Sequence, residues 1–311
     1  MSEQPKRYEP DSTTVAFIGT GVMGASMAGH LLYAGADLIV FNRTRAKAEP
    51  LIEKGARWAD SAGEAVADAQ VTISMVGFPE DVEAVYLTPG GVVERAAPGS
   101  VLVDMSTSSP ALARRIAVAA AKRDCTALDA PVSGGDVGAR NAKLTIMVGG
   151  DAAAFSAVEP LFRVMGTNVV LQGGPGAGQH TKLANQVAIA GSMLATVESL
   201  AYARAAGLDP RRVLDSISAG SAASWSLQNL GPRILDGDLA PGFFVKHFIK
   251  DMRLALESAE ELGVELPGLA CAKRVYDRLA AEGGEDLGTQ ALWLLYASAE
   301  ERAAAGLTPR A

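Results

Sequence analysis

A short apolar segment followed at once by a glycine-rich turn constrains the fold of this chain more than any other feature. The segment is VAFI (15–18), the turn is GTGVMG (19–24), and residues 25–35 have the pattern of a helix. A second apolar segment, DLIVF (37–41), follows. A strand, a G-x-G-x-x-G turn and a helix form the opening of a βαβ unit that binds a dinucleotide. An incidental glycine-rich turn is the alternative, and the flanking strand and helix argue against it.

The glycines of this turn have different expected roles. Gly19 permits the tight turn, Gly21 lets the backbone approach a pyrophosphate, and Gly24 lets the helix pack closely on the strand. The pyrophosphate is expected on the N–H groups and the positive dipole of the helix start. The predicted cofactor-binding residues of this segment are Gly19, Gly21, Val22, Met23 and Gly24.

The residues after the second strand bear on the choice of cofactor. Enzymes that use NAD usually place Asp or Glu there, where it accepts a hydrogen bond from the ribose 2′-OH. Here the residues are Asn42, Arg43 and Thr44. A guanidinium and a hydroxyl suit a 2′-phosphate, so we predict that these residues bind the cofactor and favour NADP over NAD. Alternatively, Arg43 stacks on adenine and both cofactors are used.

The chain then alternates strand-like and helix-like segments, as in a doubly wound sheet. QVTISMV (70–76) and SVLVDM (100–105) are predicted strands, a helix is expected from Ala111, and residues 125–172 fit further strands and one helix. Ligands of such sheets bind beyond the carboxyl ends of the strands.

Two short segments therefore lie where ligands are expected. Met75, Val76 and Thr107 follow predicted strands and are expected beside the cofactor, whereas Ser108 and Ser109 are interpreted as helix caps before Pro110. Farther along, Ser133, Gly134 and Gly135 form a glycine-rich turn whose hydroxyl and N–H groups suit a carboxylate. A tight hairpin connection is the alternative for this second turn.

A long segment without proline marks the middle of the chain. Glycines at 173, 174, 176 and 178 surround Pro175 and predict a flexible domain junction. Apolar residues then recur at helical spacing, which predicts one helix over residues 175–206. Near its start, Lys182 and Asn185 are spaced to share one face. A Lys at a domain junction is suited to stand over a bound cofactor; an exposed helix residue is the alternative.

The remaining residues show no strand pattern. Helices are expected in the Ala-, Leu- and charge-rich segments 208–220, 227–235, 243–262, 269–282 and 289–305. The predicted fold class is therefore α/β, with an N-terminal Rossmann-type doubly wound sheet, a long interdomain helix and an all-helical C-terminal domain. The predicted boundaries are a flexible tail over 1–12, a cofactor-binding domain over 13–174 and a helical domain over 175–311.

Charge and composition exclude several other functions. The formal net charge of −7 argues against nucleic acid or anionic membranes as partners. No stretch approaches the ~18 apolar residues of a membrane span, and the polar start lacks a signal core. Cys125 and Cys271 lie far apart in the sequence, which suits a reducing compartment. We therefore expect a cytoplasmic protein, and no metal site, since the histidines are scattered.

Four motifs together resemble the β-hydroxyacid dehydrogenase family, which includes 3-hydroxyisobutyrate dehydrogenases, tartronate semialdehyde reductases and glyoxylate/succinic semialdehyde reductases. They are GTGVMGASMA with NRT, DAPVSGG, GAGQHTKLANQ and KDMRLAL, and the resemblance covers nearly the whole chain. It implies that Lys182 is the catalytic acid–base residue and that Asn185 is its neighbour in the substrate site. It also implies that Ser133, Gly134 and Gly135 hold the substrate carboxylate, and that Thr107 and Lys250 contact the cofactor. A homodimer or homotetramer is implied as well.

The predicted function is an NAD(P)-dependent oxidoreductase that interconverts a short 3-hydroxy acid and its semialdehyde by hydride transfer. One alternative is an imine reductase of the same architecture, a group that usually lacks the Lys. The other is a non-catalytic dinucleotide-binding module, which the Lys182–Asn185 pair argues against. The sequence leaves open the substrate, the direction of the reaction and whether residues 221–229 contribute to a site.

Overall fold

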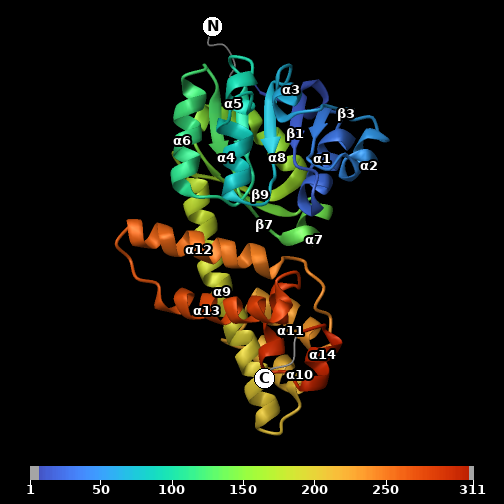
Figure 1. The fold of residues 1–311 in the computed structure, drawn as a ribbon, viewed down its shortest axis with the longest axis vertical. Coiled ribbons are helices and arrows are strands. Elements are labelled where there is room, and N and C mark those ends of the chain that lie inside the picture. Colours follow the sequence, from blue (N-terminus) through green and yellow to red (C-terminus); the bar gives the residue numbers. More distant parts are fainter. Residues whose placement is uncertain (1–6, 308–311) are drawn as a thin grey trace. The chain divides into compact units, whose positions relative to one another are not determined.

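The computed structural model describes residues 7–307. Contacts divide the chain into two compact units, Met1–Lys182 and Leu183–Ala311, and the division falls inside helix α9 (Ala177–Ala205) (Figure 1). This helix agrees within two residues with the predicted interdomain helix.

The first unit contains one sheet. Its strands are β1 (Thr14–Ile18), β2 (Asp37–Phe41), β3 (Arg57–Trp58), β4 (Val71–Ser74), β5 (Val101–Asp104), β6 (Thr126–Asp129), β7 (Val132–Ser133), β8 (Leu144–Gly149) and β9 (Gly166–Gly173). The order is β3-β2-β1-β4-β5-β6-β8-β7, with β9 on β8. Pairing is parallel from β3 to β6, whereas β8 is antiparallel to β6 and β7 and parallel to β9. The strands predicted from the first four apolar segments are confirmed as β1, β2, β4 and β5.

Helices cover both faces of this sheet. They are η1 (Pro10–Ser12), α1 (Val22–Tyr33), η2 (Arg45–Lys47), α2 (Glu49–Ile52), α3 (Ala62–Val66), α4 (Pro79–Leu87), α5 (Val92–Arg95), α6 (Pro110–Ala121), α7 (Gly135–Arg140) and α8 (Ala152–Met165). Val15 and Phe17 of β1 pack with α1 and α8, whereas Ala16 and Ile18 pack with α3, α4 and α6. Because both faces are buried, the strands read as continuous apolar runs rather than as alternating patterns. The doubly wound sheet is confirmed.

Two sequence predictions about the first unit are wrong. Residues 125–172 contain two helices, α7 and α8, rather than one, because the glycine-rich turn leads into a short helix. Tyr8, within the expected tail, is packed on the fold: it is 3% exposed, and its N–H donates to the carbonyl of Ala157 at 2.8 Å. Burial of that aromatic ring anchors this segment, while residues 1–6 lie outside the described residues.

The second unit is helical, as predicted. Beyond α9 it contains α10 (Pro210–Ser218), α11 (Trp225–Leu235), α12 (Val245–Glu261), α13 (Pro267–Leu279), η3 (Ala280–Gly284), η4 (Thr289–Leu295) and α14 (Ala299–Ala304). Its own core includes Met193, Phe248, Tyr276 and Leu292. The expected helix over 289–305 is wrong, because Ser298 and Glu301 form a capping box that starts a new helix after η4.

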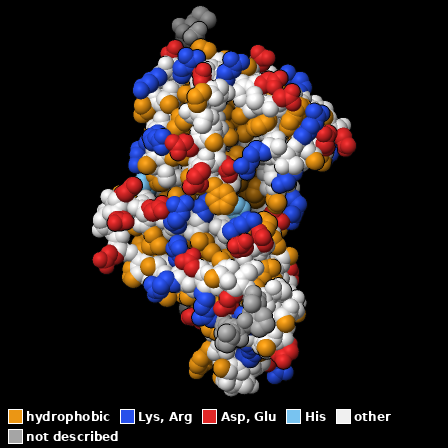
Figure 2. All heavy atoms as spheres, in the orientation of Figure 1, with side chains coloured by type: hydrophobic (Ala, Val, Ile, Leu, Met, Phe, Trp, Pro, Cys, Tyr) orange, Lys and Arg blue, Asp and Glu red, His pale blue; other side chains and the backbone are white. Residues whose placement is uncertain are grey.

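Charged side chains of both signs are interspersed over the face of the molecule in Figure 2. No helix within residues 7–307 has the length and apolar character needed to cross a membrane. In the same residues, no three or more His, Cys, Asp or Glu side chains gather as a possible metal site.

Candidate cofactor and substrate site

The glycine-rich turn between β1 and α1 is held so tightly that side chains are excluded from two of its positions. Gly19 has φ +95°, and a Cβ on it would lie 2.3 Å from the carbonyl oxygen of Met75. A Cβ on Gly24 would lie 1.9 Å from the carbonyl oxygen of Gly19. At Gly21, in contrast, a Cβ would meet nothing within 4 Å. No side chain caps α1 at Gly21, so the N–H groups of its first turn face an open cradle that fits a pyrophosphate.

The segment after β2 is tied to this turn. Asn42 accepts from the N–H of Thr20 at 3.0 Å and donates to the carbonyl of Thr44 at 2.9 Å. The exposed Arg43 forms an ion pair with Asp81 at the start of α4, with 3.0 Å between Nη1 and Oδ1. No carboxylate follows β2 directly, so the end of this strand presents an amide and a guanidinium.

The loops after β4 and β5 are joined to each other. Met75 and Val76 follow β4 and are partly buried, and the N–H of Val76 donates to Oγ of Ser106 at 2.9 Å. Thr107, also partly buried, is the next residue after Ser106. The three predicted cofactor residues of these loops therefore lie beyond the carboxyl ends of adjacent strands.

Of the two serines interpreted as helix caps, only one has that role. Oγ of Ser109 accepts from the N–H of Leu112 and caps α6. The interpretation is wrong for Ser108, because Ser109 directly precedes Pro110, the first residue of the helix. The N–H of Ser108 instead donates to the side chain of Gln179 at 2.9 Å.

A buried acid that the sequence did not single out lies behind these loops. Oδ1 of Asp104, the last residue of β5, accepts from Oγ of Ser74 at 2.8 Å and from the N–H of Ser106 at 3.1 Å. Ser74 also shares a hydrogen bond of 2.9 Å with the hydroxyl of Tyr86. Burial raises the pKa of Asp104 to about 6, although the bonds from Ser106 and Ser74 oppose this shift. An Asp within an apolar strand gives no local signal of such a network.

We expect Asp104→Asn to stabilise the protein at neutral pH. The folded state holds the Asp104 proton up to pH about 6, whereas its ordinary pKa is 3.8, so the wild type loses stability as the pH rises between these values. A difference of about two pH units corresponds to about 3 kcal/mol. The neutral amide keeps the acceptor oxygen and avoids that loss. In urea unfolding, the variant should have a larger free energy of unfolding than the wild type at pH 8, and this difference should vanish towards pH 4. A difference that does not depend on pH would contradict this account.

The predicted carboxylate cradle opens the short helix α7. Ser133 ends β7, Gly134 and Gly135 have φ of +129° and +62°, and α7 begins at Gly135. The hairpin alternative is wrong, because α7 separates β7 from β8. His30 of α1 holds the other end of this helix, since its Nε2 lies 2.9 Å from the carbonyl oxygen of Ala139. His30 therefore connects the helix after the glycine turn to the helix after the cradle, a contact that sequence reasoning missed.

The start of α9 is docked on the sheet rather than flexible. Gly176 and Gly178 are buried. A Cβ on Gly178 would lie 2.4 Å from the carbonyl oxygen of Met147 and 2.5 Å from that of Asp129. The predicted flexible junction is therefore wrong at these two positions: their glycines permit close packing against backbone.

Two buried side chains anchor this first turn. Asp129, at the end of β6, accepts from the N–H of Gly176 at 2.7 Å and from that of Gln179 at 2.8 Å. Burial raises the pKa of Asp129, and the N–H groups of Gly176 and Gln179 oppose the shift. The Gln179 side chain donates to the carbonyl of Ser106 at 2.8 Å and accepts from Ser108. The helix start is thus bound both to the end of β6 and to the loop after β5.

Lys182 follows one turn later. It is 7% exposed, so the alternative of an ordinary exposed helix residue is wrong. It lies three residues after Gln179 and four after Gly178, on the face that meets the sheet. Because helical side chains lean towards the N-terminus, we expect its side chain to lie back over this anchored turn.

The chain matches two family models. The NAD binding domain of 6-phosphogluconate dehydrogenase matches residues 14–174, and the NAD-binding domain of NADP-dependent 3-hydroxyisobutyrate dehydrogenase matches residues 176–296. An uncharacterized oxidoreductase of Bacillus subtilis is 53% identical over 283 residues, which cover 91% of this chain and 98% of the relative. The chain belongs to the β-hydroxyacid dehydrogenase family. The function predicted from the motifs, an NAD(P)-dependent hydroxyacid dehydrogenase, is thereby confirmed.

Other members of the β-hydroxyacid dehydrogenase family agree over nearly the whole length. The 2-hydroxy-3-oxopropionate reductase of Escherichia coli is 38% identical over 278 residues, covering 89% of this chain and 95% of the reductase. The structure of Mycobacterium tuberculosis 3-hydroxyisobutyrate dehydrogenase with L-serine has a TM-score of 0.85 at 31% identity, covering 92% of this chain and 99% of that one.

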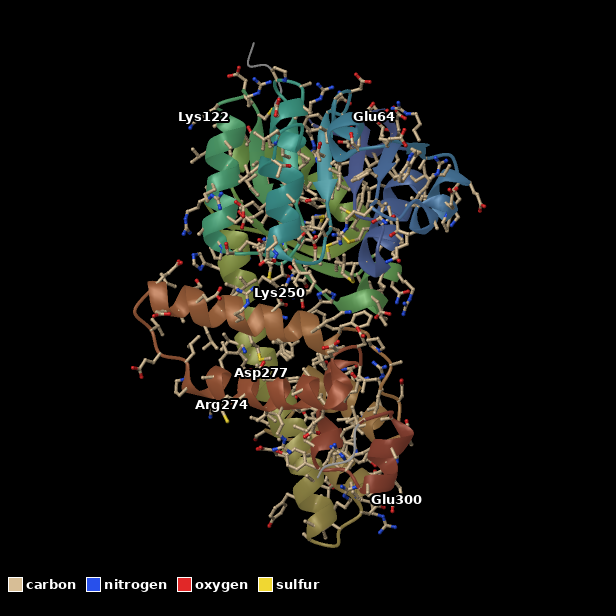
Figure 3. The ribbon with its side chains drawn as sticks, in the orientation of Figure 1. Glu64, Lys122, Lys250, Arg274, Asp277 and Glu300 are labelled. Carbon is tan, nitrogen blue, oxygen red and sulfur yellow. The ribbon has the colours of Figure 1, made fainter. Side chains whose placement is uncertain are left out.

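Asn185 and Lys250, the two predicted site residues of the second unit, belong to one connected group of polar side chains. Asn185 donates to the side chain of Gln186 at 2.8 Å, and Gln186 donates to Oδ2 of Asp251 at 2.6 Å. Lys250 is 6% exposed on α12, with its Nζ 3.2 Å from Oδ1 of Asp251 (Figure 3). The hydrogen bond between Gln186 and Asp251 thus joins the motif GAGQHTKLANQ to the motif KDMRLAL. The binding roles of these residues, the domain boundaries and the homo-oligomer stay predictions.

Proposed function

We propose that this β-hydroxyacid dehydrogenase interconverts a short 3-hydroxy acid and its semialdehyde, with Lys182 as the acid–base residue. The observation that carries the proposal is the burial of Lys182 one turn beyond a helix start anchored to the end of β6 and to the loop after β5. A buried lysine at the carboxyl edge of a doubly wound sheet lies where folds of this class bind their ligands. Lys182 is therefore suited to a role in the reaction, whereas most lysines lie exposed on the protein surface.

Residues of the first unit would bind the cofactor, bind the substrate carboxylate and transfer the proton. The turn at Gly19, Gly21 and Gly24 would hold the pyrophosphate, and Ser133 with the N–H groups after it would hold the substrate carboxylate. The nicotinamide, when bound, supplies the hydride for reduction. Lys182 Nζ would donate a proton to the carbonyl oxygen as negative charge develops there, and would take that proton back in the oxidative direction. Asn185 and Lys250 of the second unit keep the roles implied by the family, at the substrate hydroxyl and the cofactor.

A panel of substrates tests this proposal. The oxidative arm contains 3-hydroxyisobutyrate, 3-hydroxypropionate, L-serine and glycerate with NAD or NADP. The reductive arm contains glyoxylate, succinic semialdehyde and tartronate semialdehyde with NADH or NADPH, together with one cyclic imine. Turnover of a hydroxy acid or a semialdehyde is the expected result. Turnover of the imine alone would replace the proposal with the imine reductase alternative, and no turnover at all would favour a non-catalytic module.

We also propose that NADP is preferred over NAD. Arg43 is 83% exposed, and its guanidinium extends to Asp81 rather than into the fold. A 2′-phosphate would offer this guanidinium a stronger, bidentate partner than the carboxylate does. With Asn42 in place of an acidic residue, the ribose of NAD lacks its usual acceptor.

Arg43→Ala should therefore weaken NADP selectively. We expect its KM for NADP to rise about 10- to 100-fold, which corresponds to a charged hydrogen bond of about 1.5–3 kcal/mol. The KM for NAD should change little. Arg45→Ala is the matched control, because Arg45 lies two residues away but pairs with Glu49 and stacks on Trp58. An unchanged ratio of the two KM values in Arg43→Ala would remove the basis for the preference.

A further inference from the structure

The first turn of α9 is fixed in place more completely than a helix start needs for stability alone. Asp129 is 4% exposed, and its two carboxylate oxygens each accept from an N–H group of this turn, those of Gly176 and Gln179. A helix start needs partners for these N–H groups, but a single short side chain one residue before the helix normally supplies one. Here the acceptor comes from a strand of the sheet: Asp129 lies 47 residues before Gly176 and 50 residues before Gln179 in the chain.

Close packing leaves this turn little room to move. Asp129 pairs with Gly149 of β8. A Cβ on Gly149 would lie 2.6 Å from Oδ1 of Asp129 and 2.6 Å from the nitrogen of Gly178. Together with the contacts of Gly178, this places the carboxylate in a slot between two backbones. The slot fixes how far α9 advances towards the sheet.

Gln179 fixes the rotation of the helix about its axis. Its side chain is fully buried and bridges the backbone of the loop after β5, donating to the carbonyl of Ser106 and accepting from the N–H of Ser108. Ser106 in turn accepts from the N–H of Val76. The helix phase is thus set by the same loops that are expected to lie beside the cofactor.

We propose that Asp129 and Gln179 are positioning residues that hold the Lys182 side chain in its reactive place by fixing the advance and the rotation of α9. This inference rests on the proposed role of Lys182. Because Lys182 is only three residues beyond Gln179, a small rotation or fraying of the first turn moves its Nζ directly. Misplacement of a reacting group by about 1 Å can cost about 10²-fold in rate.

Two substitutions test the inference. Asp129→Asn keeps one acceptor oxygen but turns a donor towards the second N–H, and Gln179→Met keeps the side-chain length but removes both hydrogen bonds. We expect each to lower kcat about 10- to 100-fold. Asp129→Asn should also leave the Kd for NADPH, followed by its fluorescence, within about threefold, because the Asp129 carboxylate bonds to the first turn of α9 and not to the loops expected beside the cofactor. If Asp129→Asn does not fold, the kcat of Gln179→Met still tests the inference.

The matched control is Asp151→Asn. Asp151 caps α8 of the same unit by accepting from the N–H of Ala154 at 2.8 Å, and α8 carries no proposed site residue. Asparagine caps helices about as well as aspartate, so we expect this variant to keep a melting temperature near that of the wild type and to leave kcat within about twofold. An equal loss of kcat in Asp151→Asn, or wild-type kcat in both a folded Asp129→Asn and Gln179→Met, would overturn the inference.

A double variant separates this inference from the function on which it rests. If Asp129 acts through Lys182, Asp129→Asn should add no further loss of kcat to Lys182→Ala. Independent, multiplying losses would mean that Asp129 acts elsewhere, and the inference would fail while the role of Lys182 stands. Wild-type activity of Lys182→Ala alone would instead refute the proposed function itself.

Discussion

Lys182→Ala is expected to lower kcat by about 10²- to 10⁴-fold, the range in which a positioned acid or base contributes to catalysis. Its Nζ is the group that we assign to the proton of the reacting oxygen, and alanine leaves that oxygen without a donor. The KM for the cofactor should change little, because the glycine turn and the end of β2 belong to other elements. The measurement is steady-state kinetics with the substrate identified by the panel.

Two further substitutions make this result specific. Lys182→Arg keeps the positive charge but cannot give up its proton near neutral pH, so its activity should stay far below that of the wild type. Lys122→Ala removes the exposed lysine directly after α6 of the same unit and should leave kcat unchanged (Figure 3). If Lys182→Arg retained full activity, Lys182 would act through charge alone rather than through proton transfer.

The sequence predicted the parts of this molecule that are encoded locally. The segment DLIVF coincides with β2, Asp37–Phe41, because a strand buried on both faces needs an unbroken apolar run. The glycine turn was equally readable, since Gly19 and Gly24 answer to steric demands within the βαβ unit and Gly21 leaves the space expected for the pyrophosphate. The long helix was evident from its periodicity and from the absence of proline.

Residues that depend on distant contacts gave no such signal. The bonds of Asp129 and of His30 join positions 47 to 109 residues apart. Gly176 and Gly178 were interpreted as flexible because glycine spacing does not reveal whether a backbone or open solvent lies opposite. Ser108 was assigned as a cap by its distance from Pro110, although its N–H group is bound by Gln179. In each case the deciding partner lies on another strand or helix.

Gly24→Ala is expected to disrupt both the fold around the cofactor turn and cofactor binding. The added Cβ would lie 1.9 Å from the carbonyl oxygen of Gly19 and 3.2 Å from the ring of Phe17. The nearest of these atoms is backbone, so the turn must shift rather than a side chain rotate. We expect a loss of at least about 3 kcal/mol in the free energy of unfolding, at the upper end of ordinary overpacking. Thermal unfolding with and without NADPH measures both effects.

Two other glycines separate the steric cost from the loss of binding. Gly29→Ala changes the same helix where the Cβ would meet only a Leu51 methyl at 3.8 Å, and it should stabilise the helix by about 0.5–1 kcal/mol. Gly21→Ala has open space around its Cβ and an ordinary φ of −72°, so the melting temperature without cofactor should be preserved. Because that space is where we expect the pyrophosphate, the stabilisation by NADPH should be lost in Gly21→Ala. Tight NADPH binding to Gly21→Ala would show that the pyrophosphate does not approach the turn at this glycine.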